Sequence, residues 1–253
     1  MIRPLFISLL AALLGFSCAS EPASKPNYPE GTRVGIVNGL EPYLTHQHIT
    51  IERINGFTKQ IHVDWNIAAY VNTLLEDSLK KTGHFVLISI NSPQIRAQLN
   101  QLSDQIDSAA TRGIFSKDLI DFIENTGTSR DIDVIIMVKS FKGESPWKIG
   151  KNRLWIQGYG LLTRTTVLAA IGVERNWVHP YAEIRVAVFK VRPVARLGCG
   201  QPKLKKGNSE GFTWPADIKN VSPTELDKLR PVIEQYAGQA VKNALQDANM
   251  VSF

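Results

Sequence analysis

The sequence contains little cysteine: its 253 residues include two, Cys18 and Cys199, which are too few for the disulfide framework of a small secreted protein. It has no G-x-S-x-G nucleophile motif, and Gly158-Tyr159-Gly160 lacks the third glycine and the helix start of a dinucleotide-binding loop. The net charge of +6 is moderate, and no basic stripe is interleaved with aromatic residues. We therefore expect no cofactor and no nucleic-acid partner.

The beginning of the sequence is typical of a bacterial export signal. Arg3 is the only charge before an apolar run from Leu5 to Leu14 that only Ser8 interrupts, and small residues follow this run. A permanent membrane helix needs about 20 apolar residues, so the run is too short to remain in the bilayer. We predict a signal peptide over residues 1–17 and a mature protein that works outside the cytoplasm.

Cys18 determines how the mature protein is held. The segment 14–18, LGFSC, resembles the lipobox of bacterial lipoproteins, in which an aliphatic residue and two small residues precede the cysteine. The resemblance implies a diacylglyceryl group on the Cys18 thiol and, with Ala19 next, a membrane contact through a lipid anchor in the outer membrane, facing the periplasm. Two residues of the segment depart from the pattern, so ordinary cleavage after Ala19 or Ser20, which gives a soluble periplasmic protein, stays open.

The remaining chain divides into a tether and a domain. Residues 18–30 are polar and rich in proline, which predicts a flexible tether that buries no core. Residues 31–253 are expected to form a single α/β domain, since a hydrophobic fraction of 43% is ordinary for a packed core. The basic excess favours anionic neighbours such as lipid head groups or cell-wall polymers.

Hydrophobic periodicity predicts alternating strands and helices along this domain. The expected strands are residues 33–37, 48–54, 57–63, 85–90, 133–139, 155–159 and 181–191. The expected helices are residues 65–82, 93–108, 116–124 and 222–247. Asp64 is expected to cap the first helix, and Pro231 to kink or split the last one.

A hairpin is predicted between the second and third strands. Asn55-Gly56 is the strongest short hairpin signal, because a type I′ turn needs positive φ at both central positions. A two-residue loop would place Glu52 opposite Lys59, a favourable pair of opposite charges.

The candidate reactive side chains are three histidines and one cysteine. His46 and His48 share one face of a strand, whereas the expected register turns His62 to the other face. Two histidines without a third ligand are more often surface residues, so we expect no metal site. Cys199, between two glycines, is interpreted as a small residue in a glycine turn rather than a reactive thiol.

The order of the elements predicts an α/β (α+β) fold, a mixed β-sheet with helices packed on it. Residues 33–37 (RVGIV), the helix end at 79–83 (LKKTG) and the strand start at 85–88 (FVLI) resemble the opening βαβ unit of exported bacterial proteins with a TolB-amino-terminal or CsgG-like domain. The group includes curli secretion channels and cell-wall synthase activators, so the resemblance implies an assembly or interaction protein rather than an enzyme. The hairpin and the strands between 153 and 197 depart from the pattern.

Partner binding is assigned to aromatic and basic side chains in the second half of the sequence. Tryptophans favour partner-binding patches, although buried packing explains many of them. A lysine-rich loop suits an anionic polymer or membrane surface, although most charge runs are simply solvated. The candidate residues are Trp147, Trp155, Trp177, Lys203, Lys205 and Lys206.

The sequence favours a non-catalytic cell-envelope lipoprotein that faces the periplasm and binds a protein or a cell-wall polymer. A homo-oligomer is compatible with this interpretation. Two alternatives stay open: an oligomeric outer-membrane secretion or channel component built on the strands of 153–197, and a periplasmic hydrolase.

Overall fold

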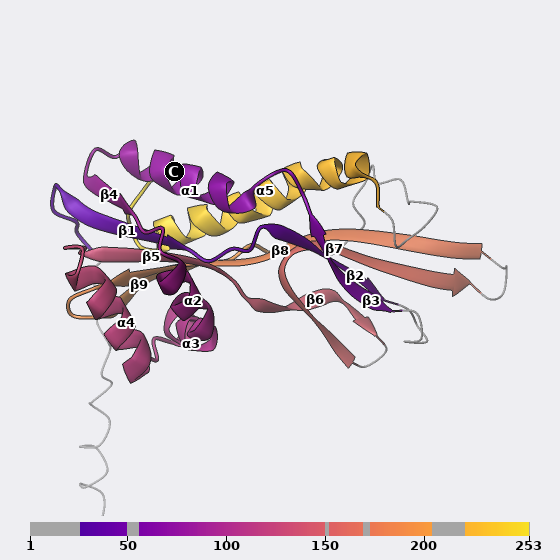
Figure 1. Ribbon diagram of the computed structural model, residues 1–253, viewed down its shortest axis with the longest axis horizontal. Helices are drawn as coiled ribbons and strands as arrows, with labels where there is room; N and C mark the ends of the chain where they lie inside the picture. The colour runs from indigo at the N-terminus through magenta and orange to yellow at the C-terminus, as the bar shows by residue number, and fades with distance from the viewer. Residues whose placement is uncertain (1–25, 50–55, 150–151, 169–172, 204–220, 253) are drawn as a thin grey trace, which may run out of the picture.

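The computed structural model describes residues 26–49, 56–149, 152–168, 173–203 and 221–252. Within these ranges the fold is mixed α/β: a curled nine-stranded sheet carries five helices (Figure 1), which confirms the expected fold class. The strands are β1 (Thr32–Asn38), β2 (Tyr43–Ile49), β3 (Phe57–His62), β4 (Phe85–Ser89), β5 (Val134–Ser140), β6 (Lys142–Ile149), β7 (Asn152–Leu168), β8 (Val173–Lys190) and β9 (Ala195–Gly200). The helices are α1 (Ile67–Lys80), α2 (Pro93–Gln101), α3 (Ser103–Arg112), α4 (Lys117–Thr128) and α5 (Pro223–Asp247).

The sheet has the strand order β3-β2-β7-β8-β5-β1-β4, with β6 beside β7 and β9 beside β8. β1 lies parallel to both β4 and β5, with Val34 opposite Leu87 on one side and Val134 on the other. The long strands β7 and β8 are antiparallel, as their period-two patterns predict. Parallel pairing of β1 with β4 agrees with the expected βαβ unit, into which the β2–β3 hairpin is inserted.

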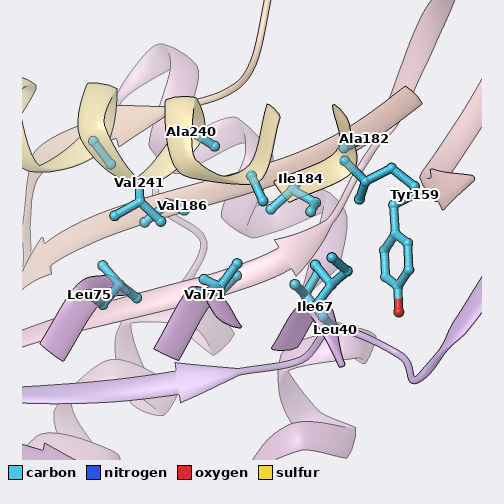
Figure 2. Close-up of a cluster of buried hydrophobic side chains, with 14 of the residues drawn as sticks. Leu40, Ile67, Val71, Leu75, Tyr159, Ala182, Ile184, Val186, Ala240 and Val241 are labelled. Atoms are coloured by element: carbon cyan, nitrogen blue, oxygen red, sulfur yellow. The ribbon is translucent and has the colours of Figure 1, made fainter. Parts of the chain in front are cut away.

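Helices cover both faces of the central strands (Figure 1). On one face α5 packs on β8, and α1 packs beside α5 and on β1 and β4; Val71, Val241 and Val186 belong to one buried cluster there (Figure 2). On the other face α2, α3 and α4 form a second cluster, in which Ile106 and Phe189 are both fully buried. The strands between these layers are apolar on both sides, which explains the unbroken apolar run of β5.

The helices differ from the predicted ones in several respects, and α4 continues to Thr128, beyond the expected end at 124. α1 is capped by Asn66, whose side chain accepts a hydrogen bond from the Ala69 amide, so the assignment of the cap to Asp64 is wrong. The expected helix 93–108 is two helices separated at Leu102, a position without a glycine or proline to mark the break. Pro231 does not split α5, because buried residues on both sides of it hold the helix against the sheet.

The register of the β2–β3 hairpin also differs from the prediction. Tyr43 pairs with His62 and His46 with Lys59, so Glu52 is not the partner of Lys59. Residues 50–55, which include Asn55, lie outside the described residues. The hairpin therefore pairs the segment that begins at Tyr43, which also pairs with β7.

Cys199 lies in β9 opposite Ala187 and not in a glycine turn. The neighbouring glycines allow α5 to approach the strand closely: a Cβ on Gly200 would lie 2.0 Å from the Ala240 carbonyl oxygen. Burial raises the pKa of the Cys199 thiol. Among the described residues, no helix is both long and apolar enough to cross a membrane.

Candidate functional site

A groove of about 590 Å³ opens between the β2–β3 hairpin, the β6–β7 hairpin and the junction of α2 with α3. We call it the polar groove. Its lining residues are Gly39, Glu41, Tyr43, Thr45, Gln47, Thr58, Gln60, Asn100, Ser103, Ser140, Lys142, Trp155, Ile156, Gln157, Gly158, Tyr159 and Tyr181. Most of these carry an amide or a hydroxyl group, so the groove is built to form hydrogen bonds.

The β2–β3 hairpin supplies one wall of the polar groove through the alternation of its side chains. Thr45 pairs with Gln60 and Gln47 with Thr58, so four polar side chains share one face of the two strands. The intervening residues of β2, such as Leu44, are buried on the opposite face. The polar wall is thus a direct result of the two-residue period of a half-buried strand.

Two glycines of β7 shape the other side of the groove. Gly158 has φ of +73° at the point where β7 passes from pairing with β6 to pairing with β8. Gly160 lies against β2 so closely that a Cβ there would be 1.9 Å from the Thr45 carbonyl oxygen. The glycine at 158 thus allows the positive φ where β7 changes partner, and the glycine at 160 lets β2 approach β7 closely.

Two tyrosines tie β2 and the segment before it to the body of the sheet. The Tyr159 hydroxyl, at the edge of the core cluster in Figure 2, donates a hydrogen bond to the Glu41 carbonyl oxygen at 2.7 Å. The Tyr181 hydroxyl donates to the Thr45 carbonyl oxygen at 3.5 Å. Burial raises the pKa of Tyr159 to about 12 and raises that of Tyr181 as well, so both phenols stay neutral donors.

The described lining of the polar groove carries no net charge. Glu41 and Lys142 are its carboxylate and its ammonium group among the lining residues. The Asn100 amide donates to a Glu41 carboxylate oxygen at 3.4 Å, and the Lys142 ammonium lies 5.6 Å from the Trp155 ring centroid. The arrangement suits non-covalent binding of a polar, uncharged ligand.

The structure places one of the predicted partner-binding residues in the groove. Trp155 lines it and remains 46% exposed. Lys203 is exposed elsewhere: its backbone amide donates to Gln239 of α5, which covers the opposite face of the sheet from α2 and α3. The side chains of Trp147 on β6 and Trp177 on β8, together with Cys18, Lys205 and Lys206, lie outside the described residues.

The histidines of β2 are buried, not surface residues as predicted. The Thr163 hydroxyl lies 2.9 Å from both His46 Nε2 and His48 Nδ1. Burial lowers the pKa of both histidines, that of His46 to about 4, with Lys59 adding to the shift. His62 is on the other face, as expected, and the described residues hold no group of three or more His, Cys, Asp or Glu arranged for a metal ion.

A buried ionic cluster lies behind the groove. Lys139 and Arg185 both form ion pairs with Asp107, and Lys139 also donates to the carbonyl oxygen of the groove residue Ser103 at 3.0 Å. Desolvation lowers the pKa of Lys139. Glu183, beside Arg185 on β8, is buried against Gly143, and this burial raises its pKa to about 7.

Sequence reasoning found Trp155 but missed the polar wall. The signal was present in the alternation of Tyr43, Thr45 and Gln47 with apolar or histidine residues. The remaining lining residues carry no local signal, because they meet in space from separate segments spread between Gly39 and Tyr181.

Comparison with known proteins gives little guidance to function. No protein-family model and no curated protein matches the sequence. A solved structure of a hypothetical protein from Chlamydia trachomatis is similar at 12% sequence identity and a TM-score of 0.28, and the match covers 82% of this chain and 98% of that chain. A TM-score this low carries no argument, so the function must be inferred from the groove itself.

Proposed function

We propose that this protein is a non-catalytic binding protein of the cell envelope, lipid-anchored through Cys18, that holds a cell-wall or protein partner in the polar groove. The observation that carries the proposal is the groove itself: two hairpins of one sheet enclose about 590 Å³ lined mainly by amide and hydroxyl groups. The export signal and the lipobox resemblance support the location in the cell envelope, and the groove supports the binding role.

The way the groove is supported favours binding by a preformed site. Hydrogen bonds from Tyr159 and Tyr181 fix the backbone at Glu41 and Thr45. Because these contacts form without a ligand, little free energy is needed to order the groove when a ligand binds. Such a preformed site suits a factor that positions its ligand for assembly or recruitment.

Site-specific photo-crosslinking in intact cells tests the binding role. A crosslinking amino acid at Gln60 or Gln157, both exposed in the groove, should give adducts with the partner. The matched control is Glu124, which is exposed on α4 on the outer layer. Adducts at all three positions, or at none, would contradict the proposal that the groove is the binding surface.

Metabolic labelling with a fatty-acid analogue tests the anchor separately. The wild-type protein should incorporate the label, and Cys18→Ala should lose it, because the thiol is the acceptor of the diacylglyceryl group. Label retained by Cys18→Ala, or absent from the wild type, would remove the anchor and leave the groove to be judged by crosslinking alone.

A further inference from the structure

We propose that the polar groove binds a neutral glycan chain, with one sugar ring stacked on Trp155. This inference rests on the proposed function, since it assigns a ligand class to the same groove. It follows from three features of the described lining: side-chain recognition along β2, a surplus of groups that both donate and accept hydrogen bonds, and the exposed Trp155 ring among lining residues that carry no net charge.

In its β2 part the groove wall offers side chains and not a free strand edge, whereas β3 is the edge strand of the sheet. β2 pairs with β3 on one side and with β7 on the other, so its backbone groups in the Thr45–Gln47 stretch are used within the sheet. A peptide that adds as an extra strand needs an unpaired edge for its main-chain hydrogen bonds. A ligand that lies over β2 must therefore be recognised by the Thr45 and Gln47 side chains, and their β3 partners Gln60 and Thr58 add two more polar side chains on the same face.

The hydrogen-bonding groups of the lining match those of a sugar. The amides of Gln47, Gln60 and Gln157 each offer donors and an acceptor, and the hydroxyls of Thr45 and Thr58 do both as well. Sugar hydroxyls are also both donors and acceptors. Because each partner can take either role, such a lining satisfies a glycan without a buried polar group left unpaired.

Trp155 supplies the apolar surface that a sugar ring needs. Its side chain is 46% exposed although large aromatic side chains are usually covered. The C–H face of a pyranose ring is apolar, and covering it with an indole ring removes both surfaces from water.

The charge of the groove argues for a neutral chain over an anionic polymer. Lys142 is the ammonium group of the lining, and it already lies against the Trp155 ring, while Glu41 contributes the opposite charge. A phosphate or carboxylate polymer would need a surplus of cationic donors, which the lining residues that the structure describes do not have. An uncharged N-acetylhexosamine chain fits both the charge and the hydrogen-bonding groups.

Titration calorimetry and tryptophan fluorescence with a defined oligosaccharide test the inference. The probe is a β-1,4-linked N-acetylglucosamine pentamer, added to the purified domain. Wild type should bind it saturably with a change in tryptophan emission. Trp155→Ala should weaken binding about tenfold or more, Trp155→Phe should recover much of the loss, and Gln60→Ala should weaken it several-fold. Ile114→Ala, which alters an exposed apolar residue outside the groove lining, should bind as wild type does.

The outcomes separate the inference from the proposed function. Absence of saturable binding, equal binding by Trp155→Ala, or equal affinity for an oligogalacturonate of the same length would overturn the neutral-glycan assignment. If groove crosslinks to Gln60 then yield a protease-sensitive protein adduct, the groove remains a binding surface with a protein partner. If Gln60 and Gln157 give no adduct either, the proposed function fails together with the inference.

Discussion

Lys139 of β5 and Arg185 of β8 are directly opposite each other in the sheet, although both are cationic and buried. The Asp107 carboxylate of α3 binds both of them and thereby compensates the repulsion between the two strands. Arg185 also donates to Gln201 at 2.7 Å and lies 4.2 Å from the Phe141 ring centroid. The cluster therefore links α3 to the strands directly behind the groove.

Asp107→Asn should be strongly destabilising. The change removes the one carboxylate that both ion pairs share and leaves two buried cations facing each other. Breaking a buried pair in this way costs about 3 to 5 kcal/mol. Urea unfolding of the purified domain would measure the loss in the free energy of unfolding.

The control for this prediction is Glu76→Gln, which breaks the exposed pair between Glu76 and Lys80 on α1. Solvent screens that pair, so its loss should change the free energy of unfolding by less than about 0.5 kcal/mol. Equal effects of the two substitutions would show that Asp107 is not the compensating charge of a buried cluster.

Gly160→Ala should distort the groove as well as the fold. A Cβ at this position would lie 1.9 Å from the Thr45 carbonyl oxygen, so β2 and β7 must move apart. Such overpacking costs about 1 to 3 kcal/mol. Because Thr45 lines the groove, binding of the N-acetylglucosamine pentamer should fall as well.

Gly238→Ala is the matched control for the glycine substitution. Gly238 lies inside α5, and a Cβ there would make ordinary contacts of 3.4 Å and 3.5 Å with Tyr70 and Leu74. Alanine should stabilise the helix by about 0.5 to 1 kcal/mol. A comparable loss of stability in both variants would mean that the close approach at Gly160 does not constrain the sheet.

The fold was predictable where burial produces a local pattern of apolar residues in the sequence. The apolar run of β5 and the alternation within β7 and β8 report how many faces of each strand are covered, and the capping serine at position 222 marks the start of α5. The register of β2 with β3 was not predictable, because β2 is also paired with β7, far away in the sequence.

The groove was predictable only in part for the same reason. Trp155 was identifiable as a candidate by its residue type alone, and the polar alternation from Tyr43 to Gln47 was visible in the sequence. Nothing local shows that Thr163 approaches His46 and His48 to bury them, since 115 residues separate Thr163 from His48. Contacts of this kind depend on the packing of the whole sheet and not on any segment.

The buried His46 should make stability fall as the pH is lowered. Burial lowers its pKa to about 4 in the folded protein, whereas an unfolded histidine titrates near 6.5. Between these values the unfolded state binds more protons, so the stability present above pH 6.5 is progressively lost down to about pH 4, by up to about 3 kcal/mol. His46→Leu should remove this acid-side slope, whatever its effect on stability at neutral pH.

Urea unfolding of wild type and His46→Leu across pH 4 to 7 measures this difference. The readout is how the difference in the free energy of unfolding between wild type and His46→Leu changes with pH. A constant loss of stability from altered packing does not affect this change. The same free-energy difference at pH 4.5 and at pH 7 would contradict the prediction, because it would mean that His46 has the same pKa in the folded and the unfolded protein.

Glu183 should act in the opposite direction over the same range of pH. Burial raises its pKa to about 7 from a usual 4.5, with nearby Arg185 working the other way. The unfolded carboxyl ionises first as pH rises, so this contribution to stability is complete below pH 4.5 and is lost through pH 7.

Glu183→Gln cannot ionise, so its free energy of unfolding should rise relative to that of wild type by up to about 3 kcal/mol between pH 4.5 and pH 7.5. Because the buried His46 and His48 act in the opposite direction in wild type, paired variants must be measured by urea unfolding at each pH to separate the contributions. A stability difference between Glu183→Gln and wild type that does not grow with pH would show that this carboxyl ionises in the fold as it does in water.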